Sequence, residues 1–381
     1  MSTSRSADAT TYLDHAASTP IRSAALAAMV EQLRDFHGNP TGAHRVAREA
    51  RKALEDARDQ VAAIVGVSPH GVVFTSGGTE ADNLAVCGVV AARGGVAVCG
   101  STEHHAVLDP VLHLGGRTVR VDSGGHTDLD HLADVIDEDV SLVSIMAVNN
   151  ETGVVADLAG IAAVVRANAP TAVFHSDAVQ ASNWLDLGRV FDYVDAMSLA
   201  GHKFGGPNGS GVLVIRDAVK IEPLVRGGGQ EQERRSGTQN VAAAVAFGVA
   251  IELTQTDRTN QVARITELSN RLLDGVTAIA GVEASVATES RVPGLCHFTT
   301  SVESEALLFL LEQEGIMASA ASSCASGALQ PSHVLTAMGR TDTQAAGALR
   351  LSMSHSSTAA DVEHLLSVLP NCVDQLTCGQ A

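Results

Sequence analysis

The stretch VDAMSLAGHKFGGPNGSGVLVI, residues 194–215, sets one lysine between two apolar runs and so indicates the fold. The runs Val194–Leu199 and Gly211–Ile215 have the composition of buried β-strands. Between them lie four glycines and Pro207, which indicate tight turns. We therefore expect Lys203 to be held near the protein interior.

A lysine in such a place can do chemistry that a surface lysine cannot. Most lysines are solvated surface residues, but desolvation favours the neutral, nucleophilic form of the amine. Such an amine forms a Schiff base with a carbonyl compound. Lys203 is therefore a candidate to bind pyridoxal 5′-phosphate (PLP) or another carbonyl.

Length and composition set the class of protein. A chain of 381 residues can form one large α/β domain and a smaller one. Hydrophobic residues make up 45% and charged residues 18%, as in a globular protein with a sizeable core. The formal net charge of −18 argues against a general nucleic-acid or anionic-membrane surface, because such surfaces are bound by basic patches.

The cysteines and the apolar runs bear on the compartment. The chain has six cysteines with neither a C-x-x-C pair nor zinc-ligand spacing, at positions 87, 99, 296, 324, 372 and 378. Scattered cysteines are typical of reduced cytosolic proteins. The first residues, MSTSRSADATT, lack an apolar core, and the longest apolar run, Val241–Ile251, is too short to span a bilayer. We expect a cytoplasmic protein with no membrane partner and no bound metal.

Strand-like and helical segments alternate through the first half of the chain. Apolar strands are expected near 72–75, 96–99, 117–121, 141–148 and 172–175, with helices beginning near 79, 105, 130 and 158. Such alternation indicates βαβ units and a parallel sheet covered on both faces. A long helix is expected at about 240–280, and the different rhythm of residues 281–381 indicates a smaller α+β domain.

A glycine pair follows the first of these strands. In Val72–Glu80, the strand runs into Gly77 and Gly78 and then Thr79 at the start of a helix. A helix N-terminus with closely approachable backbone suits a phosphate. The alternative is an ordinary βα turn in which Thr79 is the N-cap.

Polar residues follow the next strands. His104 could stack on a flat ring or exchange protons, or could simply start a helix. The pair Asn149 and Asn150 could donate to a phenolate oxygen or form a turn. Asp177 could pair with a protonated pyridine nitrogen or cap the next helix. All follow strands whose carboxyl ends meet at one sheet edge, where α/β proteins bind ligands.

The last hundred residues contribute a thiol and a cation. Cys324 lies in a run of Ala, Ser and Gly, residues 319–328, which offers little apolar bulk to hold it in a core. If it is a nucleophile, residues distant in sequence must favour its thiolate. Arg350, within an apolar strand-like run, needs an anionic partner and could bind a carboxylate with both nitrogens.

With these residues in place, the chain resembles the cysteine desulfurases, the class V aminotransferase group of PLP fold type I, in their long-loop branch. The resemblance runs from Tyr12 to about residue 369. It rests on the segments YLDHAASTP, FTSGGTEADN, TEHHAVLD, VNNETGVV, HSDAVQ, SLAGHKFGGPNGSGVL, RSGTQN and SSCASGALQPSHVL.

The resemblance implies a fold and a domain division. It implies a large PLP-binding domain, residues 15–255, with a mostly parallel seven-stranded sheet between helices. It implies a smaller α+β domain from residues 1–14 and 256–381, which carries the cysteine loop 317–330.

The resemblance also implies an activity, the conversion of L-cysteine to L-alanine. Lys203 would form the Schiff base, His104 would stack on the ring and move protons, and Cys324 would take the sulfur as a persulfide. The sulfur would pass to a protein acceptor or scaffold, for iron–sulfur clusters or other sulfur-containing products. The remaining implied contacts are Asp177 to the pyridine nitrogen, Asn150 and Gln180 to the phenolic oxygen, Gly78, Thr79 and His202 to the phosphate, Thr238 to the phosphate of the partner subunit in a homodimer, and Arg350, with Asn150, to the substrate.

Three residues depart from the family pattern. Ala200 stands where relatives often have a serine or threonine that contacts the phosphate, so that contact is expected to be missing. His355 replaces a common arginine, and Asn208 a frequent lysine. Two other functions stay open: selenocysteine lyase or another PLP-dependent C–S lyase, and a non-catalytic sulfur-assembly scaffold.

Overall fold

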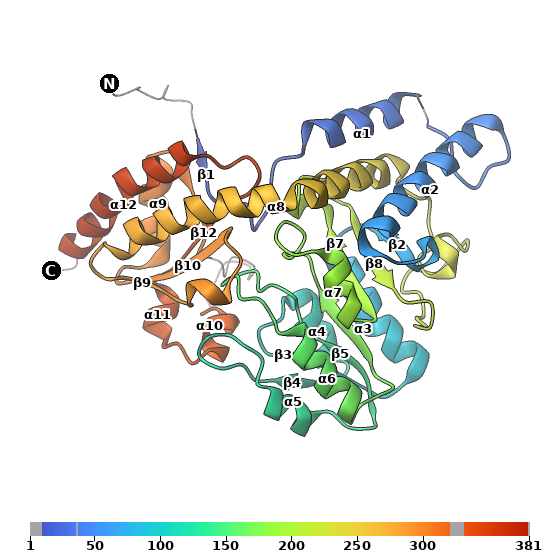
Figure 1. Cartoon of the computed structure of the whole chain (residues 1–381), viewed down its shortest axis with the longest axis horizontal. Helices are drawn as coiled ribbons and strands as arrows, with labels where there is room; N and C mark the ends of the chain where they lie inside the picture. The colour runs from blue at the N-terminus through green and yellow to red at the C-terminus, as the bar shows by residue number, and fades with distance from the viewer. Residues whose placement is uncertain (1–9, 36, 321–330, 380–381) are drawn as a thin grey trace.

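A computed structural model describes residues 10–35, 37–320 and 331–379. Figure 1 shows a larger part built on one central sheet, a smaller part around the last strands, and the long helix α8 extending over both. The cysteine predicted to carry the sulfur, Cys324, lies outside the described residues.

The central sheet has seven strands in the order β2-β8-β7-β6-β5-β3-β4. Only β8 runs opposite to its neighbours, and the other strands are parallel to one another. The carboxyl ends of these parallel strands therefore meet at one edge, as the sequence predicts. The strands are β2 (Val72–Thr75), β3 (Val96–Gly100), β4 (Arg117–Val119), β5 (Val140–Ser144), β6 (Val173–Asp177), β7 (Ala196–Ala200) and β8 (Gly211–Ile215).

Helices cover both faces of this sheet because its strands are apolar on both sides. In β6, Val173 packs with the helices on one face and Phe174 with those on the other, as successive strand side chains must. One face is covered by α3 (Gly78–Arg93) and α4 (His105–His113). The other is covered by α2 (Arg45–Val65), α5 (Leu129–Val135), α6 (Leu158–Asn168), α7 (Leu187–Tyr193) and the first part of α8 (Val241–Thr277).

Helix α8 joins the two parts of the molecule. Its first half is rich in alanine and packs against α2 and α1 (Ser23–Asp35), while its second half lies against α12 (Ala359–Gly379) and β9 (Val282–Ala284). Among the described residues, none of the helices has both the length and the apolarity that crossing a membrane requires.

The smaller part contains two short sheets. Strands β9 (Val282–Ala284), β10 (Leu295–Thr300) and β12 (Ala348–Ser352) are antiparallel, and β1 (Thr11–Tyr12) pairs in parallel with β11 (Ile316–Met317). Their helices are α9 (Ser304–Gln313), α10 (His333–Ala337), α11 (Asp342–Ala346) and α12 (Ala359–Gly379). Helix α12 extends to Gly379, and Cys372 and Val373 continue its buried face.

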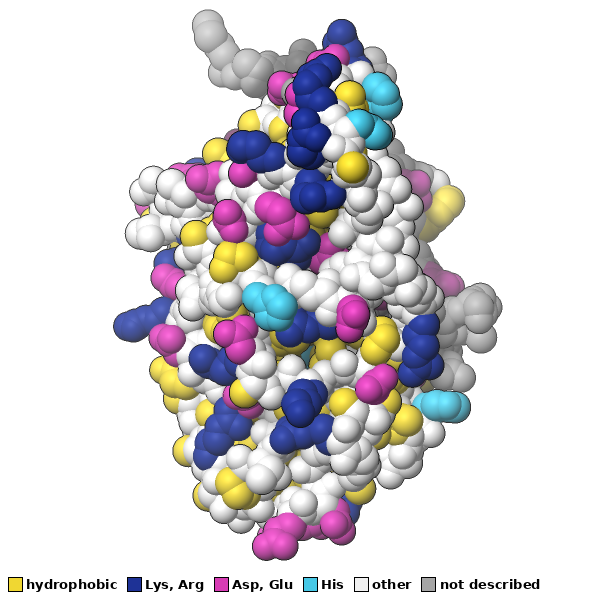
Figure 2. All heavy atoms as spheres, turned by 90° about the vertical axis from the view of Figure 1, so that its right-hand side faces the viewer, with side chains coloured by type: hydrophobic (Ala, Val, Ile, Leu, Met, Phe, Trp, Pro, Cys, Tyr) yellow, Lys and Arg dark blue, Asp and Glu magenta, His cyan; other side chains and the backbone are white. Residues whose placement is uncertain are grey.

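The surface mixes charges despite the acidic total. On the face in Figure 2, acidic side chains lie among basic ones, with a short line of Lys and Arg side chains at the top. The net charge of −18 is therefore not expressed as a continuous acidic area on this side.

Candidate active site

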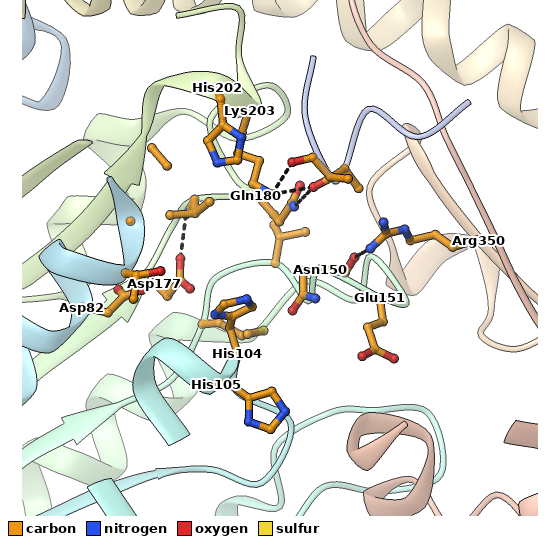
Figure 3. Close-up of a pocket in the computed structure, with 18 of the residues that line it drawn as sticks. Asp82, His104, His105, Asn150, Glu151, Asp177, Gln180, His202, Lys203 and Arg350 are labelled. Atoms are coloured by element: carbon orange, nitrogen blue, oxygen red, sulfur yellow. Dashed lines mark hydrogen bonds between the residues drawn. The ribbon is translucent and has the colours of Figure 1, made fainter. Parts of the chain in front are cut away.

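A cavity of about 420 Å³ lies at the carboxyl edge of the central sheet, between the larger and the smaller part. Figure 3 shows side chains from several strand ends pointing into it, with Arg350 entering from the smaller part. Nine of the predicted site residues line this cavity: Gly78, Thr79, His104, Asn150, Asp177, Gln180, His202, Lys203 and Arg350.

Lys203 points into the cavity from the 3₁₀ turn Gly201–Lys203 that follows β7. Its Nζ donates hydrogen bonds to the backbone carbonyls of Ala16 at 2.7 Å and Ala17 at 2.9 Å. The side-chain amide of Gln180 donates to the same Ala16 carbonyl at 2.8 Å. Sequence reasoning missed these carbonyls because backbone acceptors leave no signal in residue identity.

The N-terminus of α3 forms another wall. The helix begins at Gly78 after Gly77, and no side chain caps it, so the alternative in which Thr79 is the N-cap is wrong. A Cβ on Gly78 would lie 2.9 Å from Val179 Cγ2 and 3.4 Å from Ala200 Cβ. Glycine is therefore needed for the close packing of this turn against the strands that carry the site.

His104 combines both readings of its sequence position. It is the N-cap of α4, and its Nδ1 accepts a hydrogen bond from the Ala106 N–H at 3.0 Å, while its ring lines the cavity. Burial lowers the pKa of His104, although Asp177 partly opposes this. A neutral ring whose Nδ1 accepts carries its hydrogen on Nε2.

The two asparagines after β5 divide the predicted roles. The Asn149 side chain makes the turn, because its Oδ1 accepts from the backbone N–H groups of Glu151 and Thr152 at 3.0 and 2.9 Å. Asn150 faces the cavity, and its buried Oδ1 has no hydrogen-bond partner among the described residues. Asn150 is therefore the one available to a ligand.

Asp177 ends β6 at the bottom of the cavity. Its Oδ1 accepts from the Val179 N–H at 2.9 Å, but the next helix, α7, begins only at Leu187, so Asp177 is not a helix cap. Burial raises the pKa of this carboxyl, while the Val179 N–H, His104 and Lys203 oppose the rise.

Arg350 meets the anion that its buried strand requires. Its guanidinium donates to Asp14 Oδ1 at 2.8 Å and to the Asn150 backbone carbonyl at 2.8 Å. The buried Nε has no hydrogen-bond partner among the described residues. Sequence reasoning predicted an anionic partner but did not identify Asp14, which lies far away in the sequence.

Further polar residues that the sequence did not single out also line the cavity. The Ser332 hydroxyl, at the N-cap of α10, donates to Glu151, and the rings of His105 and His333 lie 4.6 Å apart. These contacts join α10 of the smaller part to loops of the larger part. Asp82 of α3 also reaches the cavity.

Thr238 does not line this cavity and is exposed. Its loop is fixed by two ion pairs, Glu231 with Arg58 and Arg235 with Glu80, at 2.8 and 2.7 Å. Thr238 therefore does not reach the cavity of its own chain, and its predicted contact with the phosphate of a partner subunit stays a prediction.

Of the three residues that depart from the family pattern, one lines the cavity. Ala200 lines the cavity at the end of β7 and supplies no hydroxyl there. His355 and Asn208 are not among the lining residues.

The chain is similar to known proteins over nearly its whole length. The family described as aminotransferase class-V matches residues 11–365. The chain is 42% identical to an IscS-like cysteine desulfurase of Mycobacterium tuberculosis, over 95% of this chain and 96% of the relative. It is 37% identical to the cysteine desulfurase IscS of Methanosarcina thermophila, over 96% and 92%. A solved structure named NifS-like protein superimposes with a TM-score of 0.90 at 32% identity, covering 97% of this chain and all of that one.

Proposed function

Because the chain belongs to the aminotransferase class-V family and is a PLP-dependent cysteine desulfurase, we propose that the cavity holds PLP and the substrate while Cys324 takes the sulfur. The observation that carries this proposal is the convergence of Lys203, His104 and Asp177 at one sheet edge. Two further cavities, one beside Arg58 and Glu231 and one along α1, are not lined by a lysine.

The residues present fit PLP. The tightly packed turn at Gly78 offers a helix N-terminus to the phosphate. The Asn150 side chain lines the cavity, where its amide N–H could donate to the phenolic oxygen, and the buried Asp177 carboxyl needs a cationic partner such as a protonated pyridine nitrogen. Thr79 and His202 also line the cavity and would contact the phosphate, and Gln180 would contact the phenolic oxygen. Ala200 offers the phosphate only a methyl group.

When bound, PLP supplies an electron sink that weakens bonds at the substrate's α-carbon. Lys203 would hold the aldehyde carbon of PLP, and its free amine could carry a proton. The Ala16 and Ala17 carbonyls, which accept from Nζ, orient the amine between these states. His104 lies over the same cavity, with the hydrogen on Nε2 ready for transfer.

Arg350 and Asn150 form the substrate end of the cavity. Arg350 holds its guanidinium beside Asp14 and keeps an unpartnered Nε. A substrate carboxylate would bind to this cation with charge-assisted hydrogen bonds. These contacts support a binding position for L-cysteine between Arg350 and Lys203.

The sulfur leaves on Cys324. The Cys324 thiolate attacks the substrate sulfur, the Cβ–S bond breaks, and the enzyme keeps a persulfide while the remaining three-carbon unit is released as alanine. The persulfide then passes to a protein acceptor or scaffold.

The assembly, the domain division and the location belong to the same proposal. The exposed position of Thr238, in a loop that contains two ion-paired residues, Glu231 and Arg235, supports a homodimer in which it reaches the partner's phosphate. We infer that residues 15–255 form the PLP-binding domain and that residues 1–14 and 256–381 form the smaller one. The scattered cysteines support a cytoplasmic location.

Mass spectrometry after incubation of the PLP-loaded enzyme with L-cysteine tests this proposal. We expect one added sulfur on the peptide that contains Cys324. Cys324→Ser should lose both the added sulfur and alanine formation under multiple-turnover conditions, and Lys203→Ala should also lose both.

Cys378→Ser provides the matched control, since Cys378 is an exposed cysteine on α12. This variant should keep the added sulfur and full activity. Undiminished sulfide release by Cys324→Ser, or added sulfur on Cys378 instead, would show that the proposed sulfur acceptor is wrong.

A further inference from the structure

The floor of the cavity holds more acid than the proposed function uses. Asp82 and Asp177 line the cavity and are 1% and 6% exposed, and the buried Glu103, 1% exposed, interacts electrostatically with both although it does not line the cavity. Only Asp177 has a proposed role there. Neighbouring carboxylates in a dry interior cannot all carry charge without cationic partners, so at least one of them must keep its proton.

Asp82 reaches the floor from α3. It lies one turn after Gly78, which places both residues on the helix face that lines the cavity. Figure 3 shows the Asp82 and Asp177 carboxyl groups side by side at the same end of the cavity. The Asp82 Oδ1 atom is buried and makes no hydrogen bond among the described residues.

The nearest group that could neutralise Asp82 is not available as a cation. His175 Nε2 lies 3.8 Å from Asp82 Oδ1. Its ring nitrogens, however, bond the Ser144 and Ser198 hydroxyls at 2.8 and 2.9 Å. Burial lowers the pKa of His175 to about 3, so the ring is neutral at physiological pH.

The surrounding charges favour ionisation of Asp177 over ionisation of Asp82. His104 and Lys203 favour the charged form of Asp177, and the Val179 N–H donates to it. Asp82 faces Asp177 and Glu103, which both oppose its ionisation, and the Ser198 hydroxyl gives only partial compensation. Burial and these two acids raise the pKa of Asp82 well above its usual value.

We propose that Asp82 is a positioning residue for Asp177: it stands beside it as a neutral carboxylic acid that holds the proton of the pair, so that the negative charge stays on Asp177. This inference rests on the proposed function, in which Asp177 faces the pyridine nitrogen. It explains why Asp82 lines the cavity without a cationic partner.

Infrared spectroscopy of the PLP-loaded enzyme tests the protonation state directly, because a protonated carboxyl has a C=O band that a carboxylate lacks. Near neutral pH, we expect Asp82→Asn to lose one such band, which shifts on ¹³C labelling of aspartate. Glu103→Gln is the control, because its band belongs to glutamate and does not shift on that labelling. An unchanged carboxylic-acid region in Asp82→Asn would overturn the proposal.

A second variant tests the coupling in a background that keeps Asp82. In Asp177→Asn, the neighbouring charge is gone, so the Asp82 band should disappear at a pH lower by about one unit or more. A band that titrates at the same pH in both proteins would mean that burial alone holds the proton, and would overturn the coupling.

The failure of the proposed function would look different. The role of Asp177 is read from the visible absorption of the bound cofactor and its pH dependence, which Asp177→Asn should change. An unchanged visible spectrum would overturn the role of Asp177 at the pyridine nitrogen, and with it the positioning role of Asp82. The infrared result reports on Asp82 independently.

Discussion

Two buried acidic sites in this molecule are built in opposite ways. Glu231, 4% exposed, accepts from both terminal nitrogens of Arg58 at 2.8 and 2.9 Å, from the Phe74 N–H at 2.9 Å and from the Gln239 amide at 3.3 Å. Asp82, equally buried, leaves one oxygen without a hydrogen bond. A carboxylate whose bonds are complete fixes the fold, whereas an incomplete one marks the place where chemistry occurs.

The backbone around Glu231 adopts a rare conformation that the hydrogen bonds of this residue stabilise. Glu231, Gln232 and Glu233 have φ values of 48, 60 and 66°, which side-chain-bearing residues rarely adopt. Three such residues in succession persist only where surrounding contacts fix them. The Glu231–Arg58 pair supplies these contacts and thereby holds the loop that carries Thr238.

The largest expected effect breaks the complete site. Glu231→Ala removes the buried partner of the Arg58 cation and leaves it only the half-exposed Glu55, so the free energy of unfolding should fall by about 3–5 kcal/mol. Chemical denaturation measures this. Glu233→Ala, at an exposed neighbour with the same backbone conformation, should change stability by less than about 0.5 kcal/mol. Equal losses in the two variants would mean that backbone strain, rather than the ion pair, dominates.

The next effect is a pH dependence of stability that arises from the buried His175. The folded state holds His175 neutral with a pKa of about 3, below its usual value of 6.5. Below pH 6.5 the unfolded state therefore binds more protons, and stability falls as pH decreases toward 3. The slope per proton is about 1.4 kcal/mol per pH unit.

Denaturation of the apoprotein between pH 7 and 4 should show this slope reduced in His175→Gln. His15, with a pKa of about 4, contributes in the same direction and remains in the variant as a reference. Identical slopes in the two proteins would contradict the neutral His175.

A smaller effect is expected at Asp177, where removal of the charge should raise stability, whereas at Glu231 it should lower stability. Because burial raises the pKa of Asp177, its ionisation above the usual carboxyl pKa costs stability in the apoprotein. Asp177→Asn should therefore raise apoprotein stability near neutral pH by about 1 kcal/mol. PLP affinity should fall at least about tenfold, which is equivalent to about 1.4 kcal/mol. A loss of stability in this variant would place Asp177 with Glu231 as a structural acid.

The smallest effect concerns the partly exposed ion pair of Arg235 and Glu80. This pair lies 2.7 Å apart beside the start of α3. Partial exposure weakens it, so Arg235→Gln should lower stability by less than about 1 kcal/mol. If the pair also positions Thr238 toward a partner subunit, PLP release measured by dialysis should quicken, and Thr238→Ala should give the same change without the stability loss.

The sequence predicts most of the framework because strand and helix periodicity is a local property. The central strands, the long α8 and the convergence of Lys203, His104 and Asp177 all follow from apolar runs that end in polar motifs. The acceptors of the lysine amine, the Asp14 partner of Arg350 and the floor position of Asp82 depend on tertiary contacts. No periodic pattern encodes those contacts.

The short β1 illustrates the same limit. Residues 1–11 have the polar composition of a tail, yet Thr11 and Tyr12 pair with Ile316 and Met317. A two-residue strand carries too little periodicity to be recognised. Its partner lies three hundred residues away, so only the folded chain reveals it.

Residues 11–19 have a practical consequence for anyone who modifies this protein. Leu13 exchanges backbone bonds with Met317 and Ser352 of the smaller part, Ala16 accepts from the lysine amine, and Thr19 donates to the His202 carbonyl. An affinity tag belongs ahead of this ribbon. A deletion that reaches residues 11–19 would remove the contacts between the larger and the smaller part. It would also remove the carbonyl that orients the Lys203 amine.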